Sequence, residues 1–253
     1  MVWLERNVGG VKLKYALHQR LDDNTSYLRP AVLILAGGGY EHRSRREEEP
    51  VALYFLSHGY QAFILDYTVG RENIAEREPE DEVMAAISYI RRHAGEFDVR
   101  GNKIVLLGFS AGAHLALSSQ CHALEKDEVA DALVLCYPVV TTGEYGHDGS
   151  TYNITGGKEG KKRYYSLEKE IKPSIPPVFI WQTTEDEAVS VMNSILLSYA
   201  LVECHVPFEC HLFERGKHGL SICTHDVNSY QEGTNEWLNL LFKWLEKTLS
   251  YKQ

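Results

Sequence analysis

The chain has 253 residues, of which 44% are hydrophobic and 24% charged, and its formal net charge is −9 at pH 7. This length and composition are typical of a globular protein that buries a large core, and they fit one α/β domain spanning residues 1–253. The negative charge argues against nucleic acids and anionic membranes as partners, because both favour clustered lysine and arginine. The short basic runs at 43–46 and 158–163 have acidic neighbours, so we interpret them as solvated surface.

The cysteines and the N-terminal residues indicate in which cellular compartment the protein is expected. Residues 1–6 lack the apolar segment of a secretory signal, and no run approaches membrane-spanning length. The five cysteines are an odd number without tight pairing, which predicts free thiols in a cytoplasmic protein. Two Cys-His pairs occur at 204–205 and 210–211, but a predicted strand cannot bring four such ligands together, so we expect no metal.

Apolar runs and helical periodicity alternate along the chain. Strands are predicted at 11–17, 31–35, 61–67, 104–107, 132–137, 178–182 and 208–213. Helices are predicted at 47–58, at 78–94, directly after Ser110, at 191–203 and at about 228–249. A polar turn is predicted at 22–24, between the first two strands. Alternation of this kind predicts a mostly parallel sheet with helices on both faces.

Residues 141–174 interrupt this alternation. They show little periodicity and are rich in glycine, lysine and tyrosine. A segment of this length inside a compact domain is typical of a small lid or a binding loop rather than of a separate domain. We therefore predict a lid insert within one α/β domain.

The most informative motif is Gly108-Phe109-Ser110-Ala111-Gly112, a G-x-S-x-G pattern between a buried strand and a helix. A sharp turn presents the serine hydroxyl, and glycine at both ends avoids crowding the adjoining strand and helix. The helix N-terminus favours the negative charge that develops during acyl transfer. The motif predicts Ser110 as a nucleophile, and the alternative is a tight turn with an incidental serine.

A second glycine-rich segment, 37–39, follows the strand at 31–35. Three glycines allow the backbone to approach a ligand with its amides exposed, although a flexible turn is the alternative interpretation. In parallel sheets, sites form at the carboxyl ends of the strands. Ser110, Asp186 and His218 also follow predicted strands, so we expect all four elements at one edge of the sheet.

A serine nucleophile needs a base, and His218 is the best candidate because it follows a late strand and lies between Gly216 and Gly219. His225 is the second candidate, further from the strand end. His114 lies one turn into the helix after Ser110, where we expect it to pack or to form hydrogen bonds locally.

The base needs a carboxylate that orients it and stabilises its charged form. Asp186 directly follows the strand at 178–182 and is the preferred acid. Glu185 and Glu187 flank it and remain alternatives, and three consecutive acidic residues are also compatible with a solvated loop.

The order nucleophile, acid, histidine is that of α/β-hydrolases. The sequence resembles the α/β-hydrolase esterases of the acetyl esterase and acetylxylan esterase-like group, which are related to BD-FAE and to hormone-sensitive-lipase-type enzymes. The stretches that carry the resemblance span most of the chain: 37–40, 44–50, 65–67, 108–116, 137–139, 184–189 and 217–220.

The resemblance implies an α/β-hydrolase fold, the triad Ser110, Asp186 and His218, and no cofactor. It also implies oxyanion donors at the backbone amides of Gly38, Gly39 and Ala111. Asp186 aligns because the acid of the family usually stands three residues before a valine, here Val189.

Two departures from the hormone-sensitive-lipase pattern are visible. Ala36 stands where those enzymes have a histidine, and Ser190 stands where relatives often have proline. Because oxyanion contacts come from the backbone, Ala36 is compatible with activity. The N-terminal helical cap of that subgroup is also missing, which leaves residues 141–174 as the main lid.

The resemblance suggests a small-molecule ester as substrate, with O-acetyl groups on fragments of plant polysaccharides. Candidate substrate contacts are Tyr40, Phe109 and Tyr137. The insert also contains tyrosines that either stack on a sugar ring or pack the lid itself, namely Tyr145, Tyr152, Tyr164 and Tyr165.

Other functions share these features. A formamidase-like amidase or a peptidase of the same fold would have an identical triad. A non-catalytic binding protein of the fold normally has a broken triad, and a transferase would pass the acyl group to an alcohol if water is excluded. The sequence leaves a homodimer open.

Overall fold

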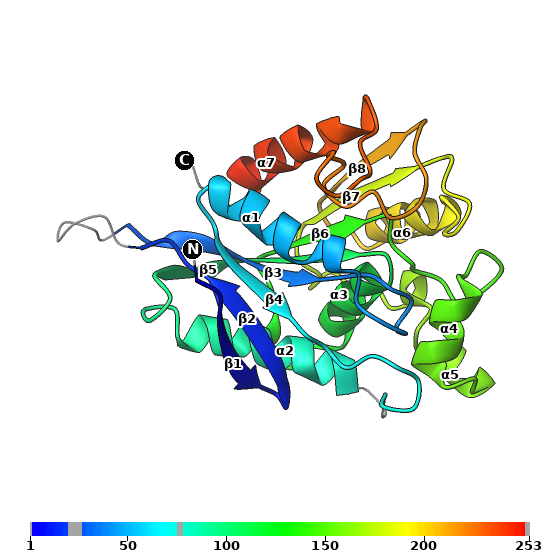
Figure 1. The fold of residues 1–253 in the computed structure, drawn as a ribbon. Helices are drawn as coiled ribbons and strands as arrows, with labels where there is room; N and C mark the ends of the chain where they lie inside the picture. The colour runs from blue at the N-terminus through cyan, green and yellow to red at the C-terminus, as the bar shows by residue number, and fades with distance from the viewer. Residues whose placement is uncertain (1, 20–26, 75–77, 251–253) are drawn as a thin grey trace.

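The computed structural model describes residues 2–19, 27–74 and 78–250, so the turn predicted at 22–24 lies outside the described residues. Within them, eight strands form one sheet in the order β1-β2-β4-β3-β5-β6-β7-β8 (Figure 1). The strands are β1 Leu4–Val8, β2 Val11–Ala16, β3 Arg29–Leu35, β4 Gln61–Leu65, β5 Val99–Phe109, β6 Ala132–Cys136, β7 Val178–Thr183 and β8 Phe208–Phe213.

The sheet is mostly parallel. Strands β3 to β8 pair in parallel, whereas β1 and β2 form an antiparallel hairpin at one edge. Because β1 is largely exposed and polar, no apolar run marked it in the sequence. Strand β5 begins at Val99, earlier than predicted. Residues 100–103 contain no apolar run, so the sequence pattern did not indicate the first half of the strand. The predicted α/β architecture is confirmed.

Helices cover both faces of the sheet (Figure 1). The α-helices are α1 Glu49–Ser57, α2 Glu78–Arg92, α3 Ala111–His122, α4 Asp148–Thr155, α5 Glu159–Lys162, α6 Met192–Glu203 and α7 Trp237–Thr248. Short 3-10 helices are η1 Arg45–Glu47, η2 Lys126–Glu128, η3 Leu167–Lys169 and η4 Thr234–Glu236. Buried residues of α1 and α7 share one core, and those of α2, α3 and α6 share the core on the other face.

Aromatic packing joins α1 and α7 to the sheet. Trp237 of α7 stacks on Trp181 of β7 with 4.8 Å between ring centroids, and Phe242 lies 5.1 Å from Phe55 of α1. The helix begins at Trp237 rather than at about 228. Asn228 and Gly233 have φ values of 52° and 81°, which an α-helix excludes.

The insert at 141–174 is partly helical, although the sequence showed little periodicity there. It contains α4, α5 and η3, and each is too short to show a helical period in the sequence. Helix α4 ends at Gly156, which adopts the left-handed conformation that favours glycine. Figure 1 shows α4 and α5 beside the two helical layers rather than within them.

All five cysteines are free, as predicted. Across 2–19, 27–74 and 78–250, no helix combines the length and the apolar character needed to cross a membrane. The same residues contain no cluster of three or more histidine, cysteine or acidic side chains arranged around a possible metal position.

Candidate active site

Ser110 lies at the sharp turn between β5 and α3. Its φ and ψ are 53° and −116°, and its amide donates to the carbonyl of Cys136 at 2.9 Å. Steric crowding explains why the positions on either side, 108 and 112, are glycine. A Cβ on Gly108 would lie 2.3 Å from the carbonyl oxygen of Gly112, and one on Gly112 would lie 2.3 Å from that of Leu35. The close approach of α3 to β3 and β5 therefore requires both glycines.

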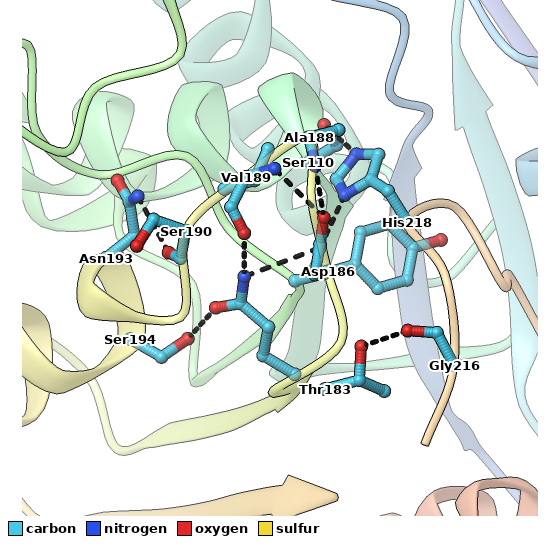
Figure 2. Close-up of polar contacts among 12 residues, drawn as sticks. Ser110, Thr183, Asp186, Ala188, Val189, Ser190, Asn193, Ser194, Gly216 and His218 are labelled. Carbon is cyan, nitrogen blue, oxygen red and sulfur yellow. Dashed lines mark hydrogen bonds and ion pairs between the residues drawn. The ribbon is translucent and has the colours of Figure 1, made fainter. Parts of the chain in front are cut away.

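Three side chains from separate loops form a hydrogen-bonded chain (Figure 2). Ser110 Oγ lies 2.8 Å from His218 Nε2, and His218 Nδ1 lies 2.7 Å from Asp186 Oδ2. The other carboxylate oxygen of Asp186 accepts hydrogen bonds from the amides of Ala188 and Val189 at 3.0 and 2.9 Å. Since the carboxylate accepts, Nδ1 donates, and Nε2 of the neutral ring is free to accept the serine proton.

The two other acidic residues have different surroundings. Glu185 accepts the amide of Gly216 at 3.0 Å, and this hydrogen bond lowers the pKa of the Glu185 carboxyl. Thr183 donates its hydroxyl to the carbonyl of Gly216 at 2.7 Å, so both residues hold the loop that carries His218. Glu187 is exposed. Only Asp186 contacts the histidine.

Neither alternative histidine reaches Ser110 Oγ. His225 is exposed and stacks on Tyr230 at 4.5 Å. His114 is buried; its Nε2 donates to the carbonyl of Tyr165 at 2.9 Å, and its Nδ1 accepts the hydroxyl of Tyr40 at 2.7 Å. Burial lowers the pKa of His114. His114 therefore packs and forms hydrogen bonds as expected, but its partners are distant in the sequence rather than local.

The glycine-rich loop after β3 borders the same site. A Cβ on Gly38, whose φ is 128°, would lie 2.2 Å from the carbonyl oxygen of His42, so the loop requires glycine there. Gly38 and Gly39 line a cleft together with Ser110. Ala111 is the first residue of α3 and is fully buried. Among the described residues, none accepts a hydrogen bond from these three backbone amides.

The cleft has a volume of about 280 Å³. Its lining consists of Gly38, Gly39, Glu41, His42, Ser44, Arg46, Glu47, Ser110, His147, His218 and Gly219. Every one of these residues is polar or glycine, and none has a purely hydrocarbon side chain. The cleft therefore offers polar side chains as hydrogen-bond partners to a ligand.

Comparison with known proteins gives several relatives. The family model described as BD-FAE matches residues 19–132. The solved structure of an acetyl ester-xyloside bifunctional hydrolase from Caldicellulosiruptor lactoaceticus is 32% identical with a TM-score of 0.84, covering 96% of this chain and 89% of that one. A sugar hydrolase from Lactococcus lactis is 31% identical with a TM-score of 0.88, covering 98% and 99%.

The chain belongs to the acetyl esterase-like family of α/β-hydrolases. This confirms the resemblance and the fold predicted from the motifs. Two curated relatives are Endo-1,4-beta-xylanase B of Butyrivibrio fibrisolvens, 37% identical over 83% of this chain, and an acetylxylan esterase of Xylanibacter ruminicola, 29% identical over 77%. The alignments cover only 35% and 42% of those relatives, so this α/β-hydrolase chain spans less than half of their length.

A buried carboxyl that the sequence did not single out connects two loops of this α/β-hydrolase. Glu47 accepts the amide of Gly37 at 2.7 Å and the hydroxyl of Tyr137 at 2.7 Å, and burial raises its pKa. The Tyr137 hydroxyl accepts the amide of Ser221, and its ring meets that of His218 edge-on at 5.0 Å. Glu47 lies in the 44–50 stretch of the resemblance, but a run of charged residues is typical of surface.

Gln182 is a second residue that the sequence analysis missed, and it supports the turn around Asp186. Gln182, fully buried in β7, donates to the carbonyl of Val189 at 2.7 Å and accepts the hydroxyl of Ser194 at 2.6 Å. It therefore braces the turn that holds Asp186. The sequence offered no signal for Gln182 beyond a polar residue at the end of a buried strand.

The three aromatic residues predicted to contact substrate do not line the cleft, which corrects that expectation. Phe109 is fully buried, and Tyr40 and Tyr137 are 1% and 2% exposed. The Tyr40 hydroxyl is bonded to His114, and that of Tyr137 to Glu47. All three side chains pack in the two hydrophobic cores, and the position of a residue next to a motif in the sequence does not show which way its side chain points.

The tyrosines of the insert also lie outside the cleft lining. Tyr164 stacks on His122 at 4.0 Å and donates to Glu80 at 3.2 Å, and Tyr165 is 2% exposed. Tyr152 lies on the surface against Arg71, and Tyr145 is exposed as well. The packing interpretation therefore fits Tyr164 and Tyr165.

Proposed function

We propose that this protein is a serine carboxylesterase that hydrolyses esters of short acyl groups, chiefly acetyl, on polyols such as sugars and xylo-oligosaccharides. The observation that carries the proposal is the hydrogen-bonded chain from Ser110 through His218 to Asp186. A serine hydroxyl with an oriented imidazole base is the arrangement that acyl transfer requires.

In the acylation step, His218 Nε2 takes the proton of Ser110 as Oγ attacks the ester carbonyl. The Asp186 carboxylate stabilises the imidazolium that forms. The carbonyl oxygen becomes an oxyanion, for which the amides of Gly38, Gly39 and Ala111 are the donors at hand. His218 then protonates the alcohol oxygen as the alcohol leaves, and an acyl-enzyme remains.

In the second step, water attacks the acyl-enzyme while His218 again accepts a proton. The tetrahedral intermediate collapses with return of that proton to Ser110 Oγ, and the carboxylic acid leaves. The same oxyanion donors serve both steps, so loss of one donor is expected to cost about 10²- to 10³-fold in rate.

The character of the cleft supports the substrate class. The lining of polar residues and glycine supplies partners for hydroxyl groups, and it contains no hydrocarbon side chain on which a long alkyl chain would pack. The names of the relatives point in the same direction, since they include an acetyl ester-xyloside hydrolase and an acetylxylan esterase.

The test is hydrolysis of the 4-nitrophenyl esters of acetate, butyrate and octanoate by the wild type and by Ser110→Ala. We expect kcat/KM to be highest for acetate and to fall by at least about 10⁴-fold in the variant, because the nucleophile is lost. An unchanged thermal unfolding midpoint of Ser110→Ala would show that the fold is intact.

A wild type that is inert on every ester would contradict the proposal, and hydrolysis of an N-formyl amide by that protein would then favour the amidase. A preference for octanoate would contradict the short-acyl assignment alone.

A further inference from the structure

Helix α4 of the insert lies directly against the glycine-rich loop. Asn153 Nδ2 donates to the carbonyl of Gly39 at 2.8 Å. A Cβ added to Gly39 would lie 3.8 Å from Ser150 Oγ and 4.0 Å from the ring of His147. His147, the residue before α4, therefore lines the cleft, and the helix is held to the glycine-rich loop by the hydrogen bond of Asn153.

His147 precedes α4 and caps it. The backbone amide of Ser150 donates to His147 Nδ1 at 3.1 Å, and Ser150 Oγ lies 2.8 Å from the same nitrogen. A backbone amide can only donate, so Nδ1 is an acceptor without a proton. In the neutral ring, Nε2 then carries the proton. Burial and the neighbouring His218 lower the pKa of His147, which favours this neutral form.

The Nε2 atom of His147 remains available. It has no hydrogen-bond partner among the described residues and is not buried, and its residue lines the cleft together with Ser110 and His218. The helix cap holds the ring in one orientation. The cleft thus contains a neutral N–H donor whose tautomer is set by the cap rather than by the substrate.

The part of the substrate that meets this donor follows from the mechanism. The carbonyl oxygen is assigned to the amides of the glycine-rich loop, and the leaving oxygen must lie at His218 Nε2 to receive its proton. His147 lies against the glycine-rich loop and lines the same cleft as His218. The alcohol portion of the ester therefore extends past His147.

We propose that His147 Nε2–H donates a hydrogen bond to a hydroxyl or ring oxygen of the alcohol portion, so that the enzyme favours acetylated sugars and polyols over acetates of apolar alcohols. This inference rests on the esterase function proposed above and names its specificity-determining residue.

Two substitutions of His147 test the roles of its two ring nitrogens separately. In His147→Asn, the amide oxygen can still cap α4, but the donor in the cleft is lost. In His147→Gln, the longer side chain carries an N–H donor to the position of Nε2, whereas the cap is weakened. The matched substrates are a mono-acetylated methyl xyloside and cyclohexyl acetate. The six-membered ring of cyclohexyl acetate lacks the ring oxygen and the hydroxyl groups of the xyloside.

We expect His147→Asn to lower kcat/KM for the acetylated xyloside by about tenfold, the effect of one hydrogen bond, and to change that for cyclohexyl acetate by less than about twofold. His147→Gln should keep kcat/KM for the xyloside within about threefold of the wild type. Thermal unfolding of each variant reports on the α4 cap independently.

Equal losses on both esters, or no loss on either, would overturn the role of His147 while leaving the esterase proposal intact. A wild type that hydrolyses neither ester would overturn the esterase proposal and this inference with it. The Ser110→Ala comparison distinguishes these cases, because an active wild type with an inactive serine variant establishes the nucleophile regardless of His147.

Discussion

At the scale of single residues, Glu47 shows how a side chain outside the triad can control its geometry. One carboxyl oxygen holds the glycine-rich loop through Gly37, and the other holds Tyr137, whose ring packs against His218. Glu47 and Tyr137 are 90 residues apart in the chain. Glu47 therefore connects the glycine-rich loop to the tyrosine that packs against His218.

Replacing Glu47 by Gln preserves the shape but leaves only one acceptor for two donors, the Gly37 amide and the Tyr137 hydroxyl. We expect kcat for 4-nitrophenyl acetate to fall by about 10- to 100-fold through displacement of these loops, with little change in KM. Steady-state kinetics measures both constants.

The neighbouring Glu48→Gln is the control, because Glu48 lies outside the cleft lining and contacts Arg43. Its kcat should stay within about twofold of the wild type. A Glu47→Gln enzyme as active as this control would show that the carboxyl does not position the site.

At the scale of elements, His114 connects three parts of the chain. It belongs to α3, accepts a hydrogen bond from Tyr40 of the glycine-rich loop, and donates to the carbonyl of Tyr165 in the insert. Because the ring is buried, the neutral form is favoured and the pKa of His114 is lowered from 6.5. The insert is thereby attached to α3, the helix that follows Ser110, through a buried imidazole whose neutral form is favoured.

This shift predicts the direction of a pH effect on stability. Below pH 6.5 the unfolded chain protonates His114 while the folded chain does not, so the free energy of unfolding decreases as pH falls, by at most about 1.4 kcal/mol per pH unit for this group. The decrease ends once the pH lies below the lowered pKa of the folded state. Above pH 6.5 His114 contributes no pH dependence.

The variant His114→Gln should be less stable at pH 8 by about 1–3 kcal/mol, because buried hydrogen bonds are lost, yet its stability should fall less steeply between pH 6.5 and 5.5. Urea unfolding of both proteins at several pH values measures the difference. Parallel curves for the two proteins would show that His114 does not take up a proton on unfolding in this range.

At the scale of the whole molecule, the sheet is stabilised by two separate cores, one on each face. The core beneath α1 and α7 includes Leu241, which is fully buried and lies outside the cleft lining. The sheet presents the site at the carboxyl ends of its parallel strands, so the core below this edge affects stability and the loops above it affect chemistry.

Leu241→Ala should reduce the free energy of unfolding by about 2–5 kcal/mol, since it removes buried methyl groups and leaves a cavity. Denaturant unfolding measures this loss, and kcat of the folded variant should remain close to that of the wild type. Lys243→Ala, at an exposed position of the same helix, should change stability by less than about 0.5 kcal/mol. A matching loss in both variants would point to the helix itself rather than to the core.

Local patterns determined the parallel strands, the main helices and the three side chains that meet at the site. Ser110, Asp186 and His218 were found from the sequence because each follows a strand, and parallel strands bring their carboxyl ends to one edge. The turn around Ser110 was equally predictable, since the approach of α3 to the sheet leaves no room for a Cβ at Gly108 or Gly112.

Only the tertiary structure decided where the remaining side chains point. Tyr40, Phe109 and Tyr137 turn into the core, and the role of Glu47 depends on a contact with Tyr137, far along the chain. His147 lies in an insert whose helices are too short to show a period, so its place beside the triad was invisible in the sequence. Periodicity records which face of an element is buried, whereas contacts between distant loops arise only when the whole sheet has been assembled.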